Sequence, residues 1–207
     1  YGSKIPAWEH PLIRNHEACK LSSSLAISLA QKHQTRLHVL HLTTAQELDL
    51  FNNNTPLGNK RITSEVCVHH LFFDDRDYEQ LGNLIKCNPA IKTENDKLAL
   101  CQALMDGKMD VVATDHAPHT MEEKSRDYAD APSGLPLVQH PLNLMLTLGK
   151  QHGWGIEFIV EKMAHNPAVC FEIENRGFLR EGYFADLVIL DPEATLEVKK
   201  HDLLYKC

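Results

Sequence analysis

Periodic and alternating hydrophobic positions divide the chain into a repeated series of helices and strands. Residues 14–33 carry apolar side chains at helical spacing and predict a long helix with one buried stripe, formed by Ala18, Leu21, Leu25 and Leu29. Short runs of apolar and β-branched residues, bounded by loops and polar segments, predict strands. The predicted strands are 37–43, 62–70, 84–91 and 109–115.

Capping signals mark where two of the intervening helices begin. Thr44 with Glu47 fits a capping box, and Thr93 with Asp96 starts a second helix. On that second helix, one face is expected to gather Leu98, Cys101 and Met105. The remaining predicted segments are a charged loop at 120–136 and helices at 137–150 and 156–164.

The order of these elements predicts an α/β fold with parallel strands joined by helical crossovers. Four strands fit either a doubly wound sheet or half of an eight-stranded barrel. No glycine-rich phosphate loop follows any strand, which weighs against a nucleotide-binding sheet. The segment 176–198 has no helical stripe, and ADLVILD (185–191) reads as a strand of a small β element outside the main body.

Composition narrows the classes of partner. The net charge of −7 and the pI near 6.0 argue against a nucleic-acid or anionic-membrane surface, and leave a small-molecule substrate open. Six cysteines occur without a C-x-x-C pair, so reduced thiols in a cytoplasmic protein are expected. No apolar run is long enough to span a bilayer, and no signal peptide opens the chain.

Each of three strands is expected to end in a residue that can bind a metal, and each of these residues shares a strand face with the residue two positions before it. His41 shares its face with Val39, His70 shares its face with Val68, and Asp115 shares its face with Ala113. Ligands bind at the C-terminal ends of parallel strands in such folds. Two neutral imidazoles and one carboxylate suit Zn²⁺ or another borderline divalent ion.

Taken singly, each of these residues is better explained by a structural role. A strand-end histidine usually bonds a backbone carbonyl, and Asp115 alone could cap the following turn. By parity, His38 is expected to be structural, and His69 is expected to pack under a helix or meet solvent, while His116 does local work. The three residues together, at equivalent strand ends, favour metal ligation.

Four motifs resemble the dihydroorotase family, a cyclic amidase branch of the amidohydrolase superfamily. They are LHVLHLTTA (37–45), VHHLFF (68–73), IKCNPAIK (85–92) and ATDHAPHT (113–120) followed by EEK and APSG. The resemblance extends almost end to end. Residues 10–30 resemble the helix that enters the fifth barrel strand, and residues 165–192 resemble the exit into a small β domain, which hydantoinases and allantoinases share.

The resemblance implies a fold, a reaction and site residues. The fold is strands 5–8 of a TIM-type (β/α)8 barrel in residues 1–175, with an incomplete small β domain in residues 176–207. The reaction is the reversible conversion of dihydroorotate to N-carbamoyl-L-aspartate in pyrimidine biosynthesis. The implied metal ligands for one or two Zn²⁺ ions are His41, His70 and Asp115, with Asp115 also the general base and acid. The implied substrate contacts are Asn88, His119, Ser133 and Gly134.

Departures from the family pattern leave alternatives open. Three features of the family have no counterpart in this sequence: the H-x-H of the first strand, the arginine near it, and the metal ligand of the fourth strand. The chain is therefore expected to be a fragment that is inactive alone. Lys92 stands where related sequences often have arginine. A hydantoinase- or allantoinase-like amidase and a non-catalytic dihydroorotase-like domain both remain possible readings, and a homo-oligomer is an open expectation.

Overall fold

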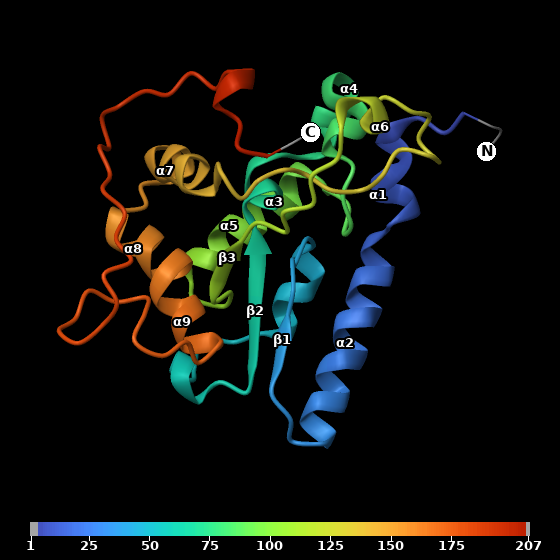
Figure 1. Cartoon of the computed structure of the whole chain (residues 1–207). Helices are drawn as coiled ribbons and strands as arrows, with labels where there is room; N and C mark the ends of the chain where they lie inside the picture. The colour runs from blue at the N-terminus through green and yellow to red at the C-terminus, as the bar shows by residue number, and fades with distance from the viewer. Residues whose placement is uncertain (1–3, 206–207) are drawn as a thin grey trace.

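Three parallel strands form the centre of the protein in a computed structural model that describes residues 4–205. The strands are β1 (Leu37–Val39), β2 (Ile62–Cys67) and β3 (Val111–Ala113), in the order β1-β2-β3. Leu37 pairs with Ile62, and Cys67 pairs with Ala113. The three C-terminal strand ends therefore lie at one edge of the sheet, as Figure 1 shows.

Helices surround this sheet, with α2 alongside β1 and α7, α8 and α9 on the opposite side (Figure 1). The α-helices are α1 (His10–Ile13), α2 (His16–Lys32), α3 (Val68–Phe72), α4 (Tyr78–Leu81), α5 (Glu94–Met105), α6 (Met121–Lys124), α7 (Pro141–His152), α8 (Ile156–Val160) and α9 (Asn166–Cys170). A π-helical turn, Glu161–His165, joins α8 to α9. The 3-10 turns are Ala7–Glu9, Ala45–Leu50, Leu57–Asn59, Asp75–Asp77, Gly82–Ile85 and Lys200–Asp202.

Local sequence signals located the three longest helices correctly. Both capping interactions form: Thr44 with Glu47 begins the 3-10 turn Ala45–Leu50, and Thr93 with Asp96 begins α5. The long first helix and the two helices after the charged loop are also confirmed, with bounds shifted by a few residues.

The predicted strand at 84–91 is wrong, so the sheet of the described residues has three strands. This segment begins with the end of the 3-10 turn Gly82–Ile85 and continues without regular structure. Pro89 has no N–H to give to a ladder. The strand predicted at 62–70 ends at Cys67, where α3 begins, and the other two strands are shorter than expected.

The predicted buried face of the first long helix is also wrong. On α2, Leu21 and Leu25 are 63% and 61% exposed, while Ser23, Ile27 and Ala30 face the interior. On α5, Leu98 and Met105 are exposed, whereas Cys101 is buried together with Leu100 and Leu104. Helical spacing defines an apolar stripe, but it does not say which neighbour covers the stripe.

The tail does not form the predicted β element within the described residues. Residues 176–198 contain turns and extended chain but no strand, and Ile189 is 99% exposed. No strand of residues 4–205 lies beside it to complete a ladder, and a single strand leaves its backbone groups unpaired.

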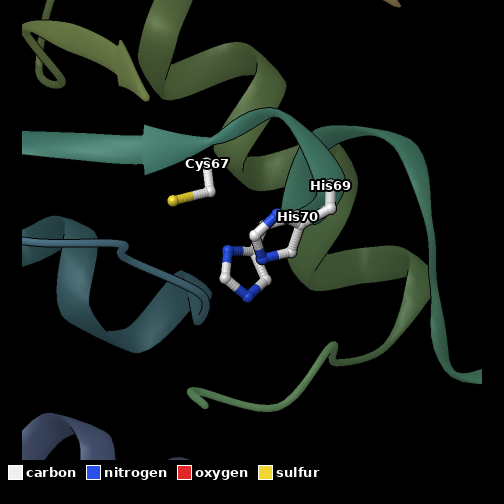
Figure 2. A group of neighbouring side chains, drawn as sticks. All are labelled: Cys67, His69 and His70. Carbon is white, nitrogen blue, oxygen red and sulfur yellow. The ribbon is translucent and has the colours of Figure 1, made fainter. Parts of the chain in front are cut away.

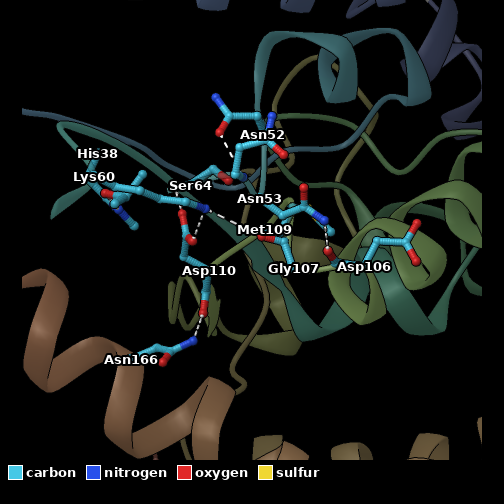
Figure 3. Close-up of polar contacts among 12 residues, drawn as sticks. His38, Asn52, Asn53, Lys60, Ser64, Asp106, Gly107, Met109, Asp110 and Asn166 are labelled. Carbon is cyan, nitrogen blue, oxygen red and sulfur yellow. Dashed lines mark hydrogen bonds and ion pairs between the residues drawn. The ribbon is translucent and has the colours of Figure 1, made fainter. Parts of the chain in front are cut away.

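A buried ion pair lies at the end of the sheet where β2 and β3 begin, opposite their C-terminal ends (Figure 3). The Lys60 ammonium lies 2.6 Å from an Asp110 carboxylate oxygen, and both side chains are less than a tenth exposed. The other Asp110 oxygen accepts the Ser64 amide at 3.0 Å, and the Asp110 carbonyl accepts the Asn166 side-chain amide at 2.7 Å. These bonds join the start of β3 to β2 and to α9.

Candidate metal centre

Two predicted site residues follow strands β1 and β3 in unusual backbone conformations. His41 has a φ of 40° and Asp115 has a φ of 44°. Residues other than glycine rarely adopt positive φ values. Such strain persists only where the surrounding structure imposes it, and it concentrates at functional sites. Because both strands are parallel, the two residues lie at the same edge of the sheet. His41 is half-buried, and Asp115 is exposed.

Between them, the end of β2 places three donor side chains together (Figure 2). Cys67, His69 and His70 each offer one donor atom, and these atoms lie within 4.8 Å of one another. All three side chains are buried. Among the described residues, this is the group of histidine, cysteine and acidic side chains whose spacing fits a metal ion.

His70 does not lie on a strand, so the parity argument that selected it is wrong. Both His69 and His70 belong to the first turns of α3, and their ring centroids are 4.2 Å apart. Of the two locations predicted for His69, under a helix or in solvent, the second is wrong, because His69 is only 1% exposed. Sequence reasoning missed Cys67 and His69 as candidate ligands, because a strand pattern places neighbouring side chains on opposite faces.

Several ring nitrogens of this cluster have no hydrogen-bond partner. His70 Nε2 lies 3.1 Å from the Pro89 carbonyl, which leaves His70 Nδ1 unpartnered. Both ring nitrogens of His69 are buried without a partner. Buried polar groups are normally satisfied, so these orphaned nitrogens indicate a bound ion or water.

Burial keeps both imidazoles neutral. It lowers the pKa of His69 to about 3, with a smaller contribution from His41, and it lowers the pKa of His70 well below its usual value. Burial also raises the pKa of Cys67, and the charges of Glu65 and Asp115 add to this effect. His41 and Asp115 are therefore close enough to the cluster to act on it electrostatically. Neutral imidazoles are the form that ligates metals, so the two histidines fit a borderline divalent ion, whereas the raised pKa of Cys67 favours the thiol, which is not the ligating form.

The predicted substrate contacts lie in two groups. Asn88 is exposed and lines a cavity of about 460 Å³ between α2 and β1, together with His41, Arg14 and Glu47. His119 lies elsewhere, with its Nε2 3.1 Å from the Ser133 carbonyl. Lys92, the last residue of the IKCNPAIK motif, is buried and donates to the Ala90 carbonyl at 3.0 Å.

Gly134 belongs to the second group of predicted substrate contacts, with His119 and Ser133, and allows the chain segments of this group to pack closely. Its φ is 145°, and a Cβ added there would meet Ala117 Cβ at 2.5 Å. Its amide donates to the Lys86 carbonyl at 2.9 Å. Only glycine allows the two chain segments to approach this closely.

The described cysteines are free: Cys19, Cys67, Cys87, Cys101 and Cys170. Cys207 lies outside the described residues. No helix within residues 4–205 combines the length and the apolar character that crossing a bilayer requires.

Comparisons with known proteins identify curated relatives that match most of this chain. No protein-family model matches. A curated dihydroorotase from Halobacterium salinarum is 35% identical over 205 residues, which cover 99% of this chain and 47% of that relative. A dihydroorotase from Deinococcus radiodurans is 39% identical over 163 residues, which cover 79% of this chain and 38% of the relative. The chain thus spans about half the length of the curated relatives, or less.

Solved structures show the same fold at lower identity. A D-hydantoinase from a Thermus species superposes with a TM-score of 0.78 and 22% identity, over 89% of this chain and 42% of that one. A dihydroorotase from Saccharomyces cerevisiae superposes with a TM-score of 0.67 and 18% identity, over 74% of this chain and 43% of that one. These likenesses confirm the expected partial (β/α) barrel. The chain is a homologue of the dihydroorotases over the portion of their length that it spans.

Proposed function

We propose that this chain is part of a dihydroorotase, which interconverts dihydroorotate and N-carbamoyl-L-aspartate in pyrimidine biosynthesis. The observation that carries the proposal is the 33–39% identity to curated dihydroorotases across most of the chain. The cluster at the sheet edge supports it, because a cyclic amide needs a polarised carbonyl and an activated water. A cytoplasmic location and self-association of the intact enzyme are parts of the same proposal.

A divalent ion, with Zn²⁺ the expected species and one or two ions in the intact enzyme, would be held by His41, His70 and Asp115 at this edge of the sheet. Such an ion supplies polarisation of the ring carbonyl and acidification of a water. His41 and His70 would offer neutral imidazole nitrogens, with Nδ1 the unpartnered atom of His70. Cys67 and His69 are the neighbouring donors within reach.

Asp115 would take the proton of the attacking water and pass it to the leaving ring nitrogen. Its exposure at the sheet edge allows a substrate to reach its carboxylate. Asn88 and His119 would orient the anionic substrate, and the backbone at Ser133 and Gly134 would lie beside its ring. These substrate roles follow the resemblance of the motifs.

Replacing Asp115 by asparagine in the intact protein tests the proton transfer. Asparagine tolerates positive φ, so Asp115→Asn preserves the backbone while removing the base. Turnover of dihydroorotate should fall by about 10²- to 10⁴-fold, while substrate binding is largely kept. Exposed Asp49, changed to asparagine, is the matched control and should have no effect. Undiminished turnover in Asp115→Asn would refute the base assignment.

Metal content tests the ligand set separately. His41→Asn and His70→Asn should each lower the zinc bound per purified protein, and exposed His201→Asn should not. Asparagine again suits the positive φ at position 41. A His70→Asn protein that keeps its full zinc content would remove His70 from the ligand set and leave Cys67 and His69 as the alternatives.

A hydantoinase-like cyclic amidase is the second candidate, favoured by the structural likeness to D-hydantoinase. Assaying the intact protein with dihydroorotate, hydantoin and allantoin separates the candidates. Hydrolysis of hydantoin without hydrolysis of dihydroorotate would favour this second candidate. Turnover of none of the three by zinc-loaded protein would favour a non-catalytic dihydroorotase-like domain.

A further inference from the structure

The ammonium of Lys124 is buried among backbone carbonyls. The side chain is 6% exposed, and its Nζ lies 3.1 Å from the Lys86 carbonyl, 3.1 Å from the Pro132 carbonyl and 3.0 Å from the Gly134 carbonyl. An ammonium has three donors, so all of them are used. No ion pair among residues 4–205 includes Lys124. Burying a charge without a counter-ion is costly, so the arrangement depends on all three carbonyls staying in place.

Lys86 binds the same loop from the other side. Its Nζ lies 2.5 Å from the Tyr128 carbonyl and 2.6 Å from the Ala131 carbonyl. Its own carbonyl accepts both the Lys124 ammonium and the Gly134 amide. Two lysines therefore fasten the loop 120–136 to the segment that begins at Lys86.

This junction connects the parts of the candidate site that bear substrate roles. The segment from Lys86 continues to Asn88, while the Ser133 carbonyl contacts His119. Gly134 packs against Ala117, which lies between Asp115 and His119. A shift of the 132–134 backbone would thus be transmitted to His119 and would change its distance from Asn88.

We infer that Lys124 is a positioning residue, which holds the backbone of residues 132–134 against the 86–88 segment and so sets the binding geometry for an anionic cyclic amide. The inference rests on the proposed function for the identity of the substrate. Lys124 is not expected to touch the substrate. It acts through Gly134, Ser133 and His119. Displacements near 1 Å in such supporting contacts are enough to weaken binding and orientation strongly.

Lys124→Met in the intact protein tests the inference by two measurements. Hydrogen exchange of the Gly134 amide, which donates to the Lys86 carbonyl, should accelerate about tenfold or more, while the amides of α5 exchange as before. The KM for dihydroorotate should rise about tenfold, with a smaller change in kcat. Lys124→Arg keeps the charge and should restore part of both effects.

Lys150→Met is the matched control. Lys150 is exposed and its Nζ also donates to a backbone carbonyl, that of Pro192 at 3.2 Å. Neither exchange at Gly134 nor the KM should change in this variant. If Lys124→Met does not fold, Lys124→Gln provides a second variant, which removes the charge and one of the three donors, and it should also accelerate exchange at Gly134 and raise the KM.

The outcomes separate the two proposals. Normal Gly134 exchange and normal KM in Lys124→Met would overturn the positioning role while leaving dihydroorotase activity intact. In the second variant, Lys124→Gln, normal exchange at Gly134 together with an unchanged KM would overturn it equally. A wild-type protein that does not convert dihydroorotate would refute the proposed function, and Gly134 exchange would still decide whether Lys124 holds the loop.

Discussion

At the scale of single residues, backbone conformation and burial together distinguish the candidate site from the rest of the sheet. Among residues 4–205, His41 and Asp115 are two of five non-glycine residues with positive φ, the others being Gln34, Glu172 and Asn175. Gln34, Glu172 and Asn175 are exposed and follow helices or lie in turns. His41 and Asp115 instead act electrostatically on a buried cluster, His41 on His69 and Asp115 on Cys67, and both ring nitrogens of His69 lack a partner. Strain and orphaned donors in one place indicate a site shaped for a ligand.

A different buried histidine makes stability depend on pH. His10 Nε2 lies 2.7 Å from the Cys87 carbonyl and His10 Nδ1 lies 2.7 Å from the Tyr128 hydroxyl. Burial lowers the pKa of His10 to about 4, partly opposed by the Cys87 carbonyl. Between pH 6.5 and 4 the unfolded chain binds a proton that the folded chain does not, so this contribution to stability is lost as the pH falls.

His10→Gln removes that titration. The wild-type protein should lose about 3 kcal/mol of unfolding free energy through His10 between pH 6.5 and 4. The variant should be less stable at pH 7 but should show a shallower loss over the same range. Urea unfolding at pH steps across this range measures both slopes. His33→Gln, at an exposed position, should match the wild-type slope, and an equal slope in His10→Gln would contradict the assignment.

At this scale, sequence can select candidate residues whose location follows from their place on a strand. His41 and Asp115 could be selected because parallel strands end at one edge, and the structure has this edge. Cys67 and His69 could not be selected, because the parity rule holds only while the strand continues. The turn into α3 after Cys67 brings neighbouring histidines to one side. Neither the backbone angles nor the unpartnered nitrogens are visible in a residue pattern.

At the scale of elements, the reliable predictions rest on interactions within a few residues. A capping box involves four consecutive positions, so Thr93 and Asp96 identify the start of α5 without any tertiary information. A strand needs a partner from elsewhere in the chain. Residues 84–91 and 185–191 have suitable composition, but neither has a ladder partner among the described residues. Strand predictions therefore failed where pairing decides the outcome.

The ion pair below the sheet is the contact on which the packing of β2, β3 and α9 depends most. Asp110→Ala would leave the Lys60 ammonium buried with only the Gly107 carbonyl at 3.4 Å, and would leave the Ser64 amide without its acceptor. The expected loss is about 3 to 5 kcal/mol of unfolding free energy, because an uncompensated buried charge remains.

Urea unfolding of three variants checks this prediction. Lys60→Met combined with Asp110→Ala should be more stable than Asp110→Ala alone, because the unpaired charge is removed. Asp186→Ala breaks the exposed pair with Arg176 and should cost about 1 kcal/mol or less. A loss in Asp110→Ala as small as that in Asp186→Ala would show that the buried pair does not hold these elements together.

At the scale of the whole molecule, the sheet and its outer helix present surfaces that a soluble monomer seldom exposes. Strand β1 has β2 on one side and no strand of the described residues on the other. Helix α2 lies beside it (Figure 1). Leu21, Leu25 and Leu29 of this helix are exposed. Sequence periodicity correctly identified these leucines as one stripe, and only the extent of the neighbouring chain decides whether the stripe is covered. The chain spans about half the length of its relatives, so its surfaces need not be those of the intact enzyme.

The 207-residue chain, prepared alone, should therefore associate with itself. An open strand edge and an apolar stripe both favour association. Replacing Leu21, Leu25 and Leu29 by lysine should shift sedimentation towards the 23.4 kDa monomer, because lysine keeps helix propensity while removing the apolar surface. Lysines at exposed Ser22, Ser28 and Gln31 add the same charge to α2 without removing a leucine, and should leave association largely unchanged. Equal dissociation in both triple variants would assign the effect to charge and would contradict the role of the stripe.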